Sequence, residues 1–429
     1  MLTTRPRGTN DFLPGEVEKW QHVEAVFRDI CHNFAYGEIR TPIFEHTELF
    51  FRGVGETTDI VEKEMYTFTD RSDRSLTLRP ENTAPVVRAF LEHKLFSQTQ
   101  PTKLYYIGPM FRYDKPQSGR YRQFHQVGAE ILGNHAPSAD AEAIVLAIRY
   151  LESLGLQMIA KSEKGSLLLF INSIGCPACR PNHMEELKKY LKENLRELCE
   201  DCQNRFDRNP LRILDCKVEQ CQRITDGAPD IIQYLCHDCK EHFQGVKMHL
   251  DHVGIVYEVN PRLVRGLDYY TKTTFEITSN ALGSQSSVCG GGRYDGLVEL
   301  CGGEPTPGVG FAMGVERLIL TVDKKGTPLP ATTPVDIFVA SIGTKANEMA
   351  FQIVDRLRGA GISSDMDMLN RSLRGQMKYA DKVKSSAVIL IGDDEIEKNV
   401  VTLRDMKTGG QSEISMNEIE TVIHKLLSE

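Results

Sequence analysis

The sequence has 429 residues, more than one ordinary hydrophobic core needs, so we expect two or three domains. With 41% hydrophobic and 26% charged residues it has the composition of a soluble globular protein, and no long apolar run predicts a transmembrane helix. The formal net charge of −8 excludes a chain that is basic as a whole, but it leaves room for a local basic site. The N-terminus lacks the apolar stretch of a secretory signal, which predicts a cytoplasmic protein.

The chain begins with helical and strand-like patterns. Residues 16–35 predict a long amphipathic helix, because apolar residues recur at helical spacing: Trp20, Val23, Phe27, Ile30 and Phe34. A strand-like run follows at 38–50, in which Pro42 marks an edge or a bend. The helix either packs on a sheet or contributes to a dimer surface, and periodicity does not separate these two interpretations.

Strand-like runs continue at 64–70, 76–79, 103–114 and 124–133. Thr83 is placed to cap a helix that follows the second of them. A flexible, positively charged hairpin loop joins the last two strands. Because long helices separate the strands without βαβ regularity, we expect an α+β fold on a mixed, mainly antiparallel sheet.

The composition changes between about 176 and 247, where eight of the eleven cysteines occur among many charged residues. This change predicts an inserted module. Two strand-like runs follow it within 253–277. Residues 289–303 then read as a glycine-rich turn before a short helix, and 307–323 as a strand that enters a helix.

A linker-like stretch at 324–334 precedes the C-terminal part of the chain. Short apolar strands alternate there with helices at about 345–360, 371–384 and 416–427. The pattern predicts a compact α/β domain whose strands are at least partly parallel.

The segment Phe111–Glu130 combines residues suited to phosphates and to a polar substrate. Gln126 and Glu130 share one face of its second strand, so an amide and a carboxylate project together. Guanidinium groups bind phosphate oxygens in pairs and stay charged at physiological pH. Taken alone, however, the arginines favour a solvated hairpin. These arginines are Arg112, Arg120 and Arg122.

Glu81 and Thr83 add a second carboxylate and a hydroxyl. Two carboxylates that converge on one pocket suit a substrate with an ammonium or an imidazole nitrogen. Alone, a glutamate before a helix is usually explained by the helix dipole.

Three glycine-containing motifs complete the candidate site. In RGLDYYTKTTFE, Arg265 precedes a turn, and the phenols of Tyr269 and Tyr270 are expected on opposite faces of a strand. GGGRYDG at 290–296 lets the backbone approach a ligand closely. GVERL places Arg317 early in a helix, where a structural and a functional role are equally expected.

Together these motifs resemble those of the class II aminoacyl-tRNA synthetases, and specifically of the histidyl-tRNA synthetase family. TPIFE resembles motif 1, Phe111–Glu130 resembles motif 2 and GVGFAMGVERL resembles motif 3. RGLDYYTKTTFE and GGGRYDGL resemble the two histidine-specific signatures. Five blocks spread over about 280 residues make a chance match improbable. The C-terminal α/β segment is similar in architecture to the anticodon-binding domain of several class II enzymes.

The resemblance implies a histidine–tRNA ligase that uses ATP with Mg²⁺, charges tRNA(His) with L-histidine and forms a homodimer. It implies that Arg112 and Arg265 act on the α-phosphate and on the amino-acid carboxylate. It further implies an ATP site formed by Arg112, Arg120, Phe124 and Arg317. The implied histidine site consists of Glu81, Thr83, Arg112, Gln126, Glu130, Arg265, Tyr269 and Tyr270. The expected domains are a catalytic domain (1–173 and 251–325), a cysteine-rich insertion (174–250) and an anticodon-binding domain (331–429).

The cysteine-rich insertion departs from the family pattern. Its four cysteine pairs offer enough thiolates for one or two tetrahedral zinc sites, and buried reduced cysteines are the alternative. Cys199-x2-Cys202 reads as part of a helix, whereas two other pairs lie at the ends of elements. The preferred zinc ligands are therefore Cys176, Cys179, Cys236 and Cys239.

The C-terminal domain is not basic, with 12 Lys and Arg against 15 Asp and Glu between 331 and 429. A tRNA contact therefore needs a local patch. The expected helix RSLRGQMKYADK supplies a candidate in Arg371, Arg374 and Lys378, although a solvated helix face explains it equally well.

Two other functions compete with the ligase. A synthetase-like regulatory subunit of histidine biosynthesis shares the catalytic fold and senses histidine, but it is expected to lack the active-site arginines and the anticodon-binding domain. Arg112, Arg265, Arg317 and the C-terminal domain are all present here. A zinc-dependent nucleic-acid module would leave the five blocks unexplained.

Overall fold

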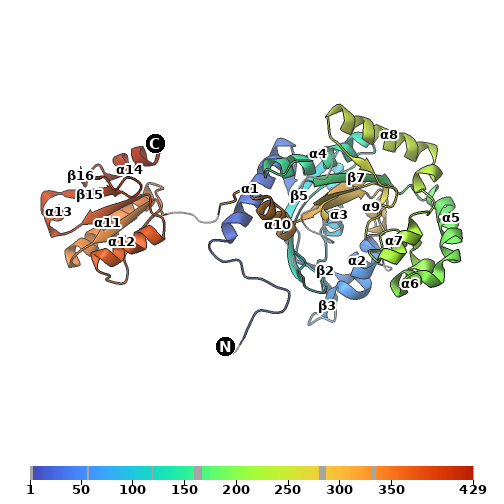
Figure 1. Ribbon diagram of the computed structural model, residues 1–429, viewed down its shortest axis with the longest axis horizontal. Helices are drawn as coiled ribbons and strands as arrows, with labels where there is room; N and C mark the ends of the chain where they lie inside the picture. Colours follow the sequence, from blue (N-terminus) through green and yellow to red (C-terminus); the bar gives the residue numbers. More distant parts are fainter. Residues whose placement is uncertain are drawn as a thin grey trace. The chain divides into compact units, whose positions relative to one another are not determined.

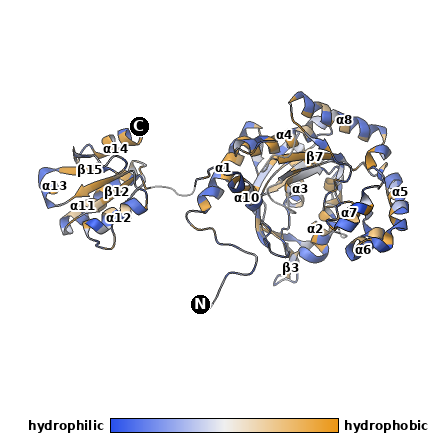
Figure 2. Ribbon diagram, viewed as in Figure 1, coloured by the Kyte–Doolittle hydropathy of each residue, from blue (hydrophilic) through white to orange (hydrophobic). Residues whose placement is uncertain are grey.

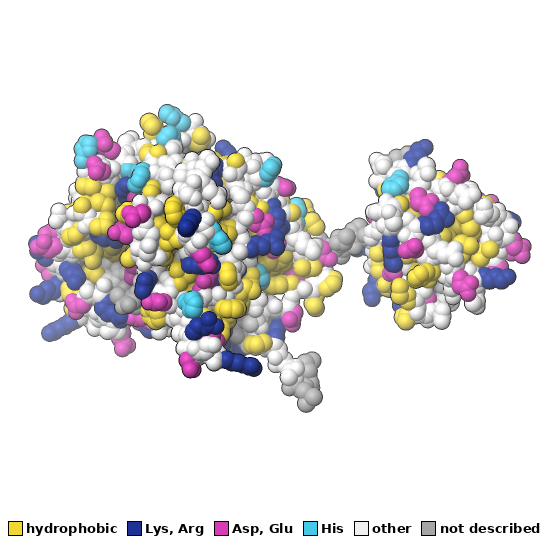
Figure 3. Space-filling model, turned by 180° about the vertical axis from the view of Figure 1, so that it is seen from behind, with side chains coloured by type: hydrophobic (Ala, Val, Ile, Leu, Met, Phe, Trp, Pro, Cys, Tyr) yellow, Lys and Arg dark blue, Asp and Glu magenta, His cyan; other side chains and the backbone are white. Residues whose placement is uncertain are grey.

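The computed structural model describes residues 3–55, 58–117, 119–158, 167–279, 287–330 and 335–428. The chain forms two compact units, residues 1–330 and 331–429 (Figure 1). On the face of each unit that Figure 3 shows, basic and acidic side chains are interspersed. Among the described residues, no helix combines the length and the apolarity that crossing a membrane requires.

The first unit is built on an eight-stranded sheet with the order β1-β5-β6-β11-β10-β9-β7-β8. Its two parallel pairings, β1–β5 and β7–β8, involve two-residue strands at the edges, and the other pairings are antiparallel. The predicted mixed, mainly antiparallel sheet is confirmed. Its strands are β1 (Gly37–Glu38), β5 (Thr102–Phe111), β6 (Gln123–Leu132), β7 (Leu167–Ser173), β8 (Glu258–Val259), β9 (Thr271–Ser279), β10 (Ser287–Arg293) and β11 (Gly308–Gly314).

Helices cover one face of this sheet and enclose the largest hydrophobic core. Alternation along β6 sends Val127, Ala129 and Ile131 into this core, so that Gln126 and Glu130 point to the opposite face. The predicted N-terminal helix is confirmed as part of this layer. The covering helices are α1 (Val17–Asn33), α4 (Pro137–Ser153), α8 (His237–His252) and α10 (Val315–Lys325).

Shorter elements lie on the opposite face. A three-stranded sheet has the order β2-β4-β3, and helices pack beside it. This side encloses a second core that leaves room for the polar residues of the sheet. The elements are β2 (Phe44–His46), β3 (Tyr66–Thr69), β4 (Ser75–Leu78), α2 (Thr47–Val54), α3 (Thr83–Glu92) and α9 (Leu297–Leu300).

The cysteine-rich segment is helical and carries many hydrophilic residues, in contrast to the apolar strand β7 (Figure 2). It contributes Leu187, Leu191 and Ile213 to the second core, so it packs against the rest of the first unit. Besides α8, its helices are α5 (Arg180–Glu193), α6 (Glu200–Arg208) and α7 (Glu219–Thr225), with 3₁₀ helices at Leu195–Glu197, Pro210–Ile213 and Ile231–Tyr234.

The second unit is the predicted compact α/β domain. Its sheet has the order β13-β12-β14-β15-β16, in which β12 is parallel to both neighbours and the remaining pairs are antiparallel. The elements are β12 (Ile337–Ser341), α11 (Thr344–Gly359), β13 (Ser364–Met366), α12 (Leu373–Lys382), β14 (Ala387–Ile391), α13 (Asp393–Lys398), β15 (Val400–Asp405), β16 (Gln411–Ser415) and α14 (Ile419–Ser428). Residues 331–334 of the expected linker lie outside the described residues.

Three local predictions were wrong. The strand expected across 38–50 is limited to Phe44–His46, and α2 begins at Thr47, because the amphipathic run from Thr47 buries one helical face. The glycine triplet at 290–292 lies within β10 rather than in a turn. A Cβ atom at any of these three positions would collide with neighbouring groups, so only glycine fits there. Tyr269 and Tyr270 lie before β9 rather than on a strand, and their ring centroids are 4.7 Å apart.

Candidate functional site

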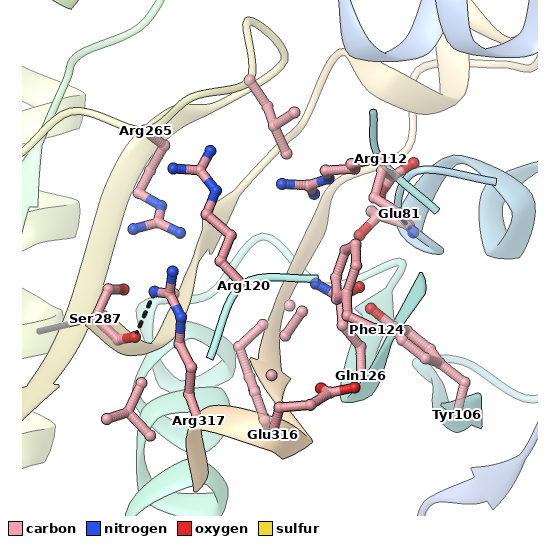
Figure 4. A pocket seen from close by; sticks show the side chains of 18 of the residues that line it. Glu81, Tyr106, Arg112, Arg120, Phe124, Gln126, Arg265, Ser287, Glu316 and Arg317 are labelled. Atoms are coloured by element: carbon pink, nitrogen blue, oxygen red, sulfur yellow. Dashed lines mark hydrogen bonds between the residues drawn. The ribbon is translucent and has the colours of Figure 1, made fainter. Parts of the chain in front are cut away.

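A cavity of about 310 Å³ lies against the face of the large sheet opposite α1 and α4. Its walls come from β5, β6, β10, β11, the start of α3 and the start of α10, with the segment before β9. Figure 4 shows Arg120, Arg265 and Arg317 on one side of this cavity and Glu81, Tyr106 and Gln126 on the other, with Arg112 beside Glu81. The structure brings together all the predicted pocket residues: Glu81, Thr83, Arg112, Arg120, Phe124, Gln126, Glu130, Arg265, Tyr269, Tyr270 and Arg317.

Glu130 is a buried carboxylate at the floor of this cavity, with 1% of its surface exposed. The hydroxyl of Thr83 donates to its Oε1 at 2.7 Å, and Tyr294 donates to its Oε2 at 2.6 Å. On the paired strand, Gly310 leaves the space that the carboxylate occupies, since a Cβ there would lie 1.7 Å from Oε2. Burial raises the pKa of Glu130 to about 8, although both hydrogen bonds favour the charged form.

Glu81 is also buried, but its carboxylate binds backbone. It accepts hydrogen bonds from the N–H groups of Thr83 at 2.7 Å and Ala84 at 2.9 Å, at the start of α3. This is the helix-dipole role that the sequence left open. The expected cap by the Thr83 hydroxyl is wrong, because that hydroxyl is bound to Glu130. Glu81 therefore fixes the helix that holds Thr83 against Glu130.

Arg112 and Phe124 lie together at the β5–β6 hairpin. The guanidinium of Arg112 lies 5.3 Å from the centre of the Phe124 ring and donates through Nε to the carbonyl of Pro80 at 2.9 Å. Burial lowers the pKa of Arg112, and the carboxylates of Glu64 and Glu81 oppose this effect. These contacts orient Arg112 where it lines the cavity.

Arg265 crosses β10 where Gly290 provides space, since a Cβ on that glycine would lie 1.8 Å from Nη2. Its Nη1 donates to Glu276 on β9 at 2.9 Å. Its Nε is buried and has no hydrogen-bond partner among the described residues. The carboxylate orients this guanidinium while part of its donor set stays unsatisfied.

Arg317 reaches the same side of the cavity from the first turn of α10. It donates to the carbonyls of Gly119 at 3.1 Å and Ser287 at 2.9 Å (Figure 4). Burial lowers the pKa of Arg317, and the positive charges of Arg120 and Arg112 lower it further. Like charges gathered in a half-buried cavity are stabilised by a bound polyanion.

Sequence reasoning missed four residues that shape the cavity. Tyr294 and Glu316 lie inside two of the motifs described above. Each of these motifs therefore contributes a further functional side chain besides its arginine or its glycines. Glu316 accepts a hydrogen bond from the backbone N–H of His125 at 2.9 Å, which ties α10 to β6. Glu276 ends the motif that begins with Arg265, but its contact with Arg265 depends on how the strands pair, and Tyr106 carries no local signal.

The cavity therefore has two chemically different halves. Buried carboxylates and phenols line one half, where the Oε1 of Gln126 also has no partner among the described residues. Guanidinium groups line the other. Such an arrangement binds a cationic or imidazole-bearing group beside a phosphate chain.

Two further predicted sets lie outside the cavity. Cys176, Cys179, Cys236 and Cys239 have sulfur atoms within 4.8 Å of one another. In the second unit, Arg374 and Lys378 are exposed on α12. The placement of Arg371 on that helix was wrong: it precedes the Ser372 cap, and Nη1 donates to Asp367 at 2.6 Å.

The chain matches known proteins over nearly its whole length. Residues 8–318 match the family described as Histidyl-tRNA synthetase, and residues 336–426 match the family described as Anticodon binding domain. The histidine–tRNA ligase of Desulforamulus reducens is 55% identical over 419 residues, which cover 98% of each chain. The solved apo histidyl-tRNA synthetase of S. aureus is 40% identical, with a TM-score of 0.82 over 98% of this chain and all of the other.

The chain belongs to the histidyl-tRNA synthetase family. The predicted class, an aminoacyl-tRNA ligase with the function of a histidine–tRNA ligase, is confirmed at this level. A structure described as an ATP phosphoribosyltransferase regulatory subunit/histidyl-tRNA synthetase, from Bacillus halodurans C, has a TM-score of 0.62. At 20% identity over 91% of this chain and 99% of the other, that likeness shows the fold alone.

The raised pKa of Glu130 predicts a pH-dependent stability. Between pH 6 and 8 the folded carboxyl binds a proton that the unfolded one has lost, so the free energy of unfolding falls as pH rises. The slope is about 1.4 kcal/mol per pH unit and flattens near pH 8. Glu130→Gln should remove this slope. Urea unfolding of the first unit at pH 6 and pH 8 measures it.

Glu299→Gln, at an exposed carboxylate, is the matched control and should keep the slope of the unchanged chain. An equal pH dependence in Glu130→Gln and in the unchanged chain would show that Glu130 is already ionised at pH 6.

Proposed function

We propose that this cavity activates L-histidine with ATP to give histidyl-adenylate and then transfers histidine to the 3′ end of tRNA(His). The observation that supports the proposal is the division of one cavity into a carboxylate-lined half and a guanidinium-lined half. AMP and pyrophosphate are the other products. Each half fits one substrate, and their common boundary is where the two substrates react.

The carboxylate-lined half fits histidine. Glu81 and Glu130 face the ammonium group, whose positive charge stabilises the ionised form of Glu130, and Gln126 and Tyr270 offer polar atoms to the imidazole. An amino acid with an apolar side chain would leave these buried groups unpaired, which costs binding energy and gives discrimination. Thr83 and Tyr269 complete this half of the cavity.

The guanidinium-lined half fits ATP. Phe124 and Arg317 lie where they can hold the adenine ring between them, and Arg120 lies where it can meet the outer phosphates. A carboxylate oxygen of histidine attacks the α-phosphorus in line, and the bond to the β-phosphate oxygen breaks as pyrophosphate leaves. Arg112 and Arg265 neutralise the charge that develops on the α-phosphate oxygens. No general base is needed, because the attacking carboxylate is already ionised.

When bound with ATP, Mg²⁺ would neutralise charge on the phosphates. Carboxylates near the guanidinium-lined half fit such a cation: Glu276 faces Arg265, and Asp114 and Glu64 are ion-paired with Arg120. These pairs also keep the arginines oriented before the nucleotide binds.

A histidine-sensing subunit that does not catalyse activation is the second candidate. It would need the carboxylate-lined half alone. The clustering of Arg112, Arg120 and Arg317 favours the ligase, because a bound polyanion stabilises like charges gathered in one cavity.

Arg265→His should reduce the kcat of histidine-dependent pyrophosphate exchange into ATP by about 100-fold or more, because a charge that stabilises the α-phosphate is lost. Histidine affinity, measured by calorimetry, should change little, because the histidine-binding carboxylates stay in place.

Arg262→His is the matched control for this variant. Arg262 lies three residues away and pairs with Asp226, with 43% of its side chain exposed, so exchange should be unchanged. Loss of histidine affinity together with exchange in Arg265→His would assign Arg265 to substrate binding instead.

We also propose that the second unit binds the anticodon region of tRNA through α12. Arg374 and Lys378 are exposed there, and the neighbouring Met368 and Leu369 are each 70% exposed. Cations beside exposed apolar side chains suit unstacked bases and their phosphates.

Arg374→Ala with Lys378→Ala should raise the KM for tRNA about tenfold in aminoacylation, while pyrophosphate exchange without tRNA stays unchanged. Lys407→Ala with Lys425→Ala, in the same unit, is the control and should leave both rates unchanged. A normal KM for tRNA in the first double variant would remove α12 from the interface.

The homodimer is a further proposal. Phe44, on β2, and Phe68, on β3, are 52% and 44% exposed, and their ring centroids lie 6.4 Å apart. Ile43 and Phe51 add to this exposed apolar surface, which a second copy of the chain would cover.

Phe44→Lys with Phe68→Lys should produce a monomer in analytical ultracentrifugation, whereas the control Val218→Lys, at an exposed apolar residue of the insertion, should remain a dimer. A dimer that persists in the double variant would place the interface elsewhere.

We retain the predicted domain boundaries and a cytoplasmic location as expectations. Limited proteolysis tests the boundaries, and cell fractionation tests the location.

We further propose that Cys176, Cys179, Cys236 and Cys239 bind a structural zinc ion. The Sγ atoms of Cys176 and Cys179 are 3.7 Å apart, close to the edge of about 3.8 Å that four sulfurs at 2.3 Å from zinc define. Elemental analysis that finds no zinc in active protein would refute this site.

A further inference from the structure

A second group of four cysteines lies in the same insertion: Cys199, Cys202, Cys216 and Cys221. Their sulfur atoms also lie within 4.8 Å of one another, and Cys199 Sγ is 3.8 Å from Cys216 Sγ. All four are reduced, and Cys202 and Cys221 are completely buried. We propose that these four cysteines form a second zinc site, which fixes the segment 199–225 as a brace for the pocket loop 263–270.

The local geometry repeats that of the first cysteine group. Cys236 is the N-cap of α8, and Cys239 is its third residue. Cys199 and Cys202 occupy the same two positions of α6. In both helices the positive end of the dipole faces the sulfurs and stabilises thiolates. The sequence interpretation missed this equivalence, because it read a continuous helix through Cys199, whereas the helix begins there.

Three buried thiols and one half-buried thiol, all within 4.8 Å of one another, are poorly explained as packing alone. The backbone N–H of Cys199 donates to Cys221 Sγ at 3.2 Å, an acceptor that is stronger as a thiolate. Four thiolates at this spacing match tetrahedral zinc, which binds as each ligand loses its proton.

The segment 199–225 has few apolar residues to hold it together, and a metal compensates for a small core. From α6, Arg205 donates to Asp59 at 2.8 Å, and Arg208 pairs with Glu62. Asn209 donates to Asp268 at 2.7 Å, next to Tyr269.

These contacts connect the cysteine group to the pocket by two routes. One passes through Asp268 to the loop that carries Arg265 and Tyr270. The other passes through the segment 59–64, where the carbonyl of Glu64 accepts a hydrogen bond from the N–H of Tyr113 at 2.7 Å, next to Arg112. Loosening α6 would therefore misplace two of the pocket arginines.

Zinc content tests the proposal directly. Untagged protein, dialysed against metal-free buffer, should contain two zinc ions per chain by inductively coupled plasma mass spectrometry. Cys202→Ser and Cys239→Ser should each retain one zinc, and Cys301→Ser, outside both groups, should retain two. One zinc or none in the unchanged chain would overturn the second site, as would iron in place of zinc.

The unchanged chain also permits a test if Cys202→Ser fails to fold. Alkylation of the native protein, followed by peptide mass spectrometry, should leave Cys199 and Cys216 unmodified until a zinc chelator is added. Modification of these cysteines without the chelator would exclude a bound metal.

Separate measurements test whether the segment 199–225 acts as a brace for the pocket loop. Cys202→Ser should lower the kcat/KM of histidine-dependent pyrophosphate exchange about tenfold and expose segment 199–225 to protease. Loss of one zinc with unchanged exchange would overturn the brace but keep the metal site. Absence of exchange in the unchanged chain would instead refute the proposed function, and the zinc count would still stand.

Discussion

The pocket depends on a carboxylate that is buried at its floor. Glu130 is held between Thr83 of α3 and Tyr294 after β10, in a space that Gly310 of β11 leaves open. Three elements that are distant in sequence are thereby fixed around one group. Burial makes the charged form of Glu130 costly, and a cation that enters the pocket offsets this cost. The pocket therefore favours the binding of a positively charged or proton-donating ligand.

The same sheet face also explains how the guanidinium-lined half is built. Glycines on the central strands remove side chains where functional groups must cross the sheet, and Gly290 does this for Arg265 as Gly310 does for Glu130. On the opposite face, alternation gives an apolar core that holds these strands rigid. Rigid strands with a few missing side chains position charged groups without the mobility of a loop.

Much of this arrangement could be predicted from sequence, because alternation along β5 and β6 is a local property. This alternation predicted that Gln126 and Glu130 share one face of the sheet, and the motif resemblance predicted that the arginines belong to one site. The partner of Arg265 could not be predicted, because Glu276 meets it only through pairing of β9 and β10. The predicted role of Thr83 was wrong for the same reason, since its hydroxyl donates a hydrogen bond to a residue 47 positions away.

In the function we propose, one half of the cavity selects the amino acid, and the other binds and polarises the nucleotide. The most direct test of this account is amino-acid-dependent exchange of pyrophosphate into ATP by the purified protein without tRNA. The account predicts exchange with histidine and none with phenylalanine or leucine. Tight binding of histidine with no exchange would contradict it and would identify a histidine-binding protein without ligase activity.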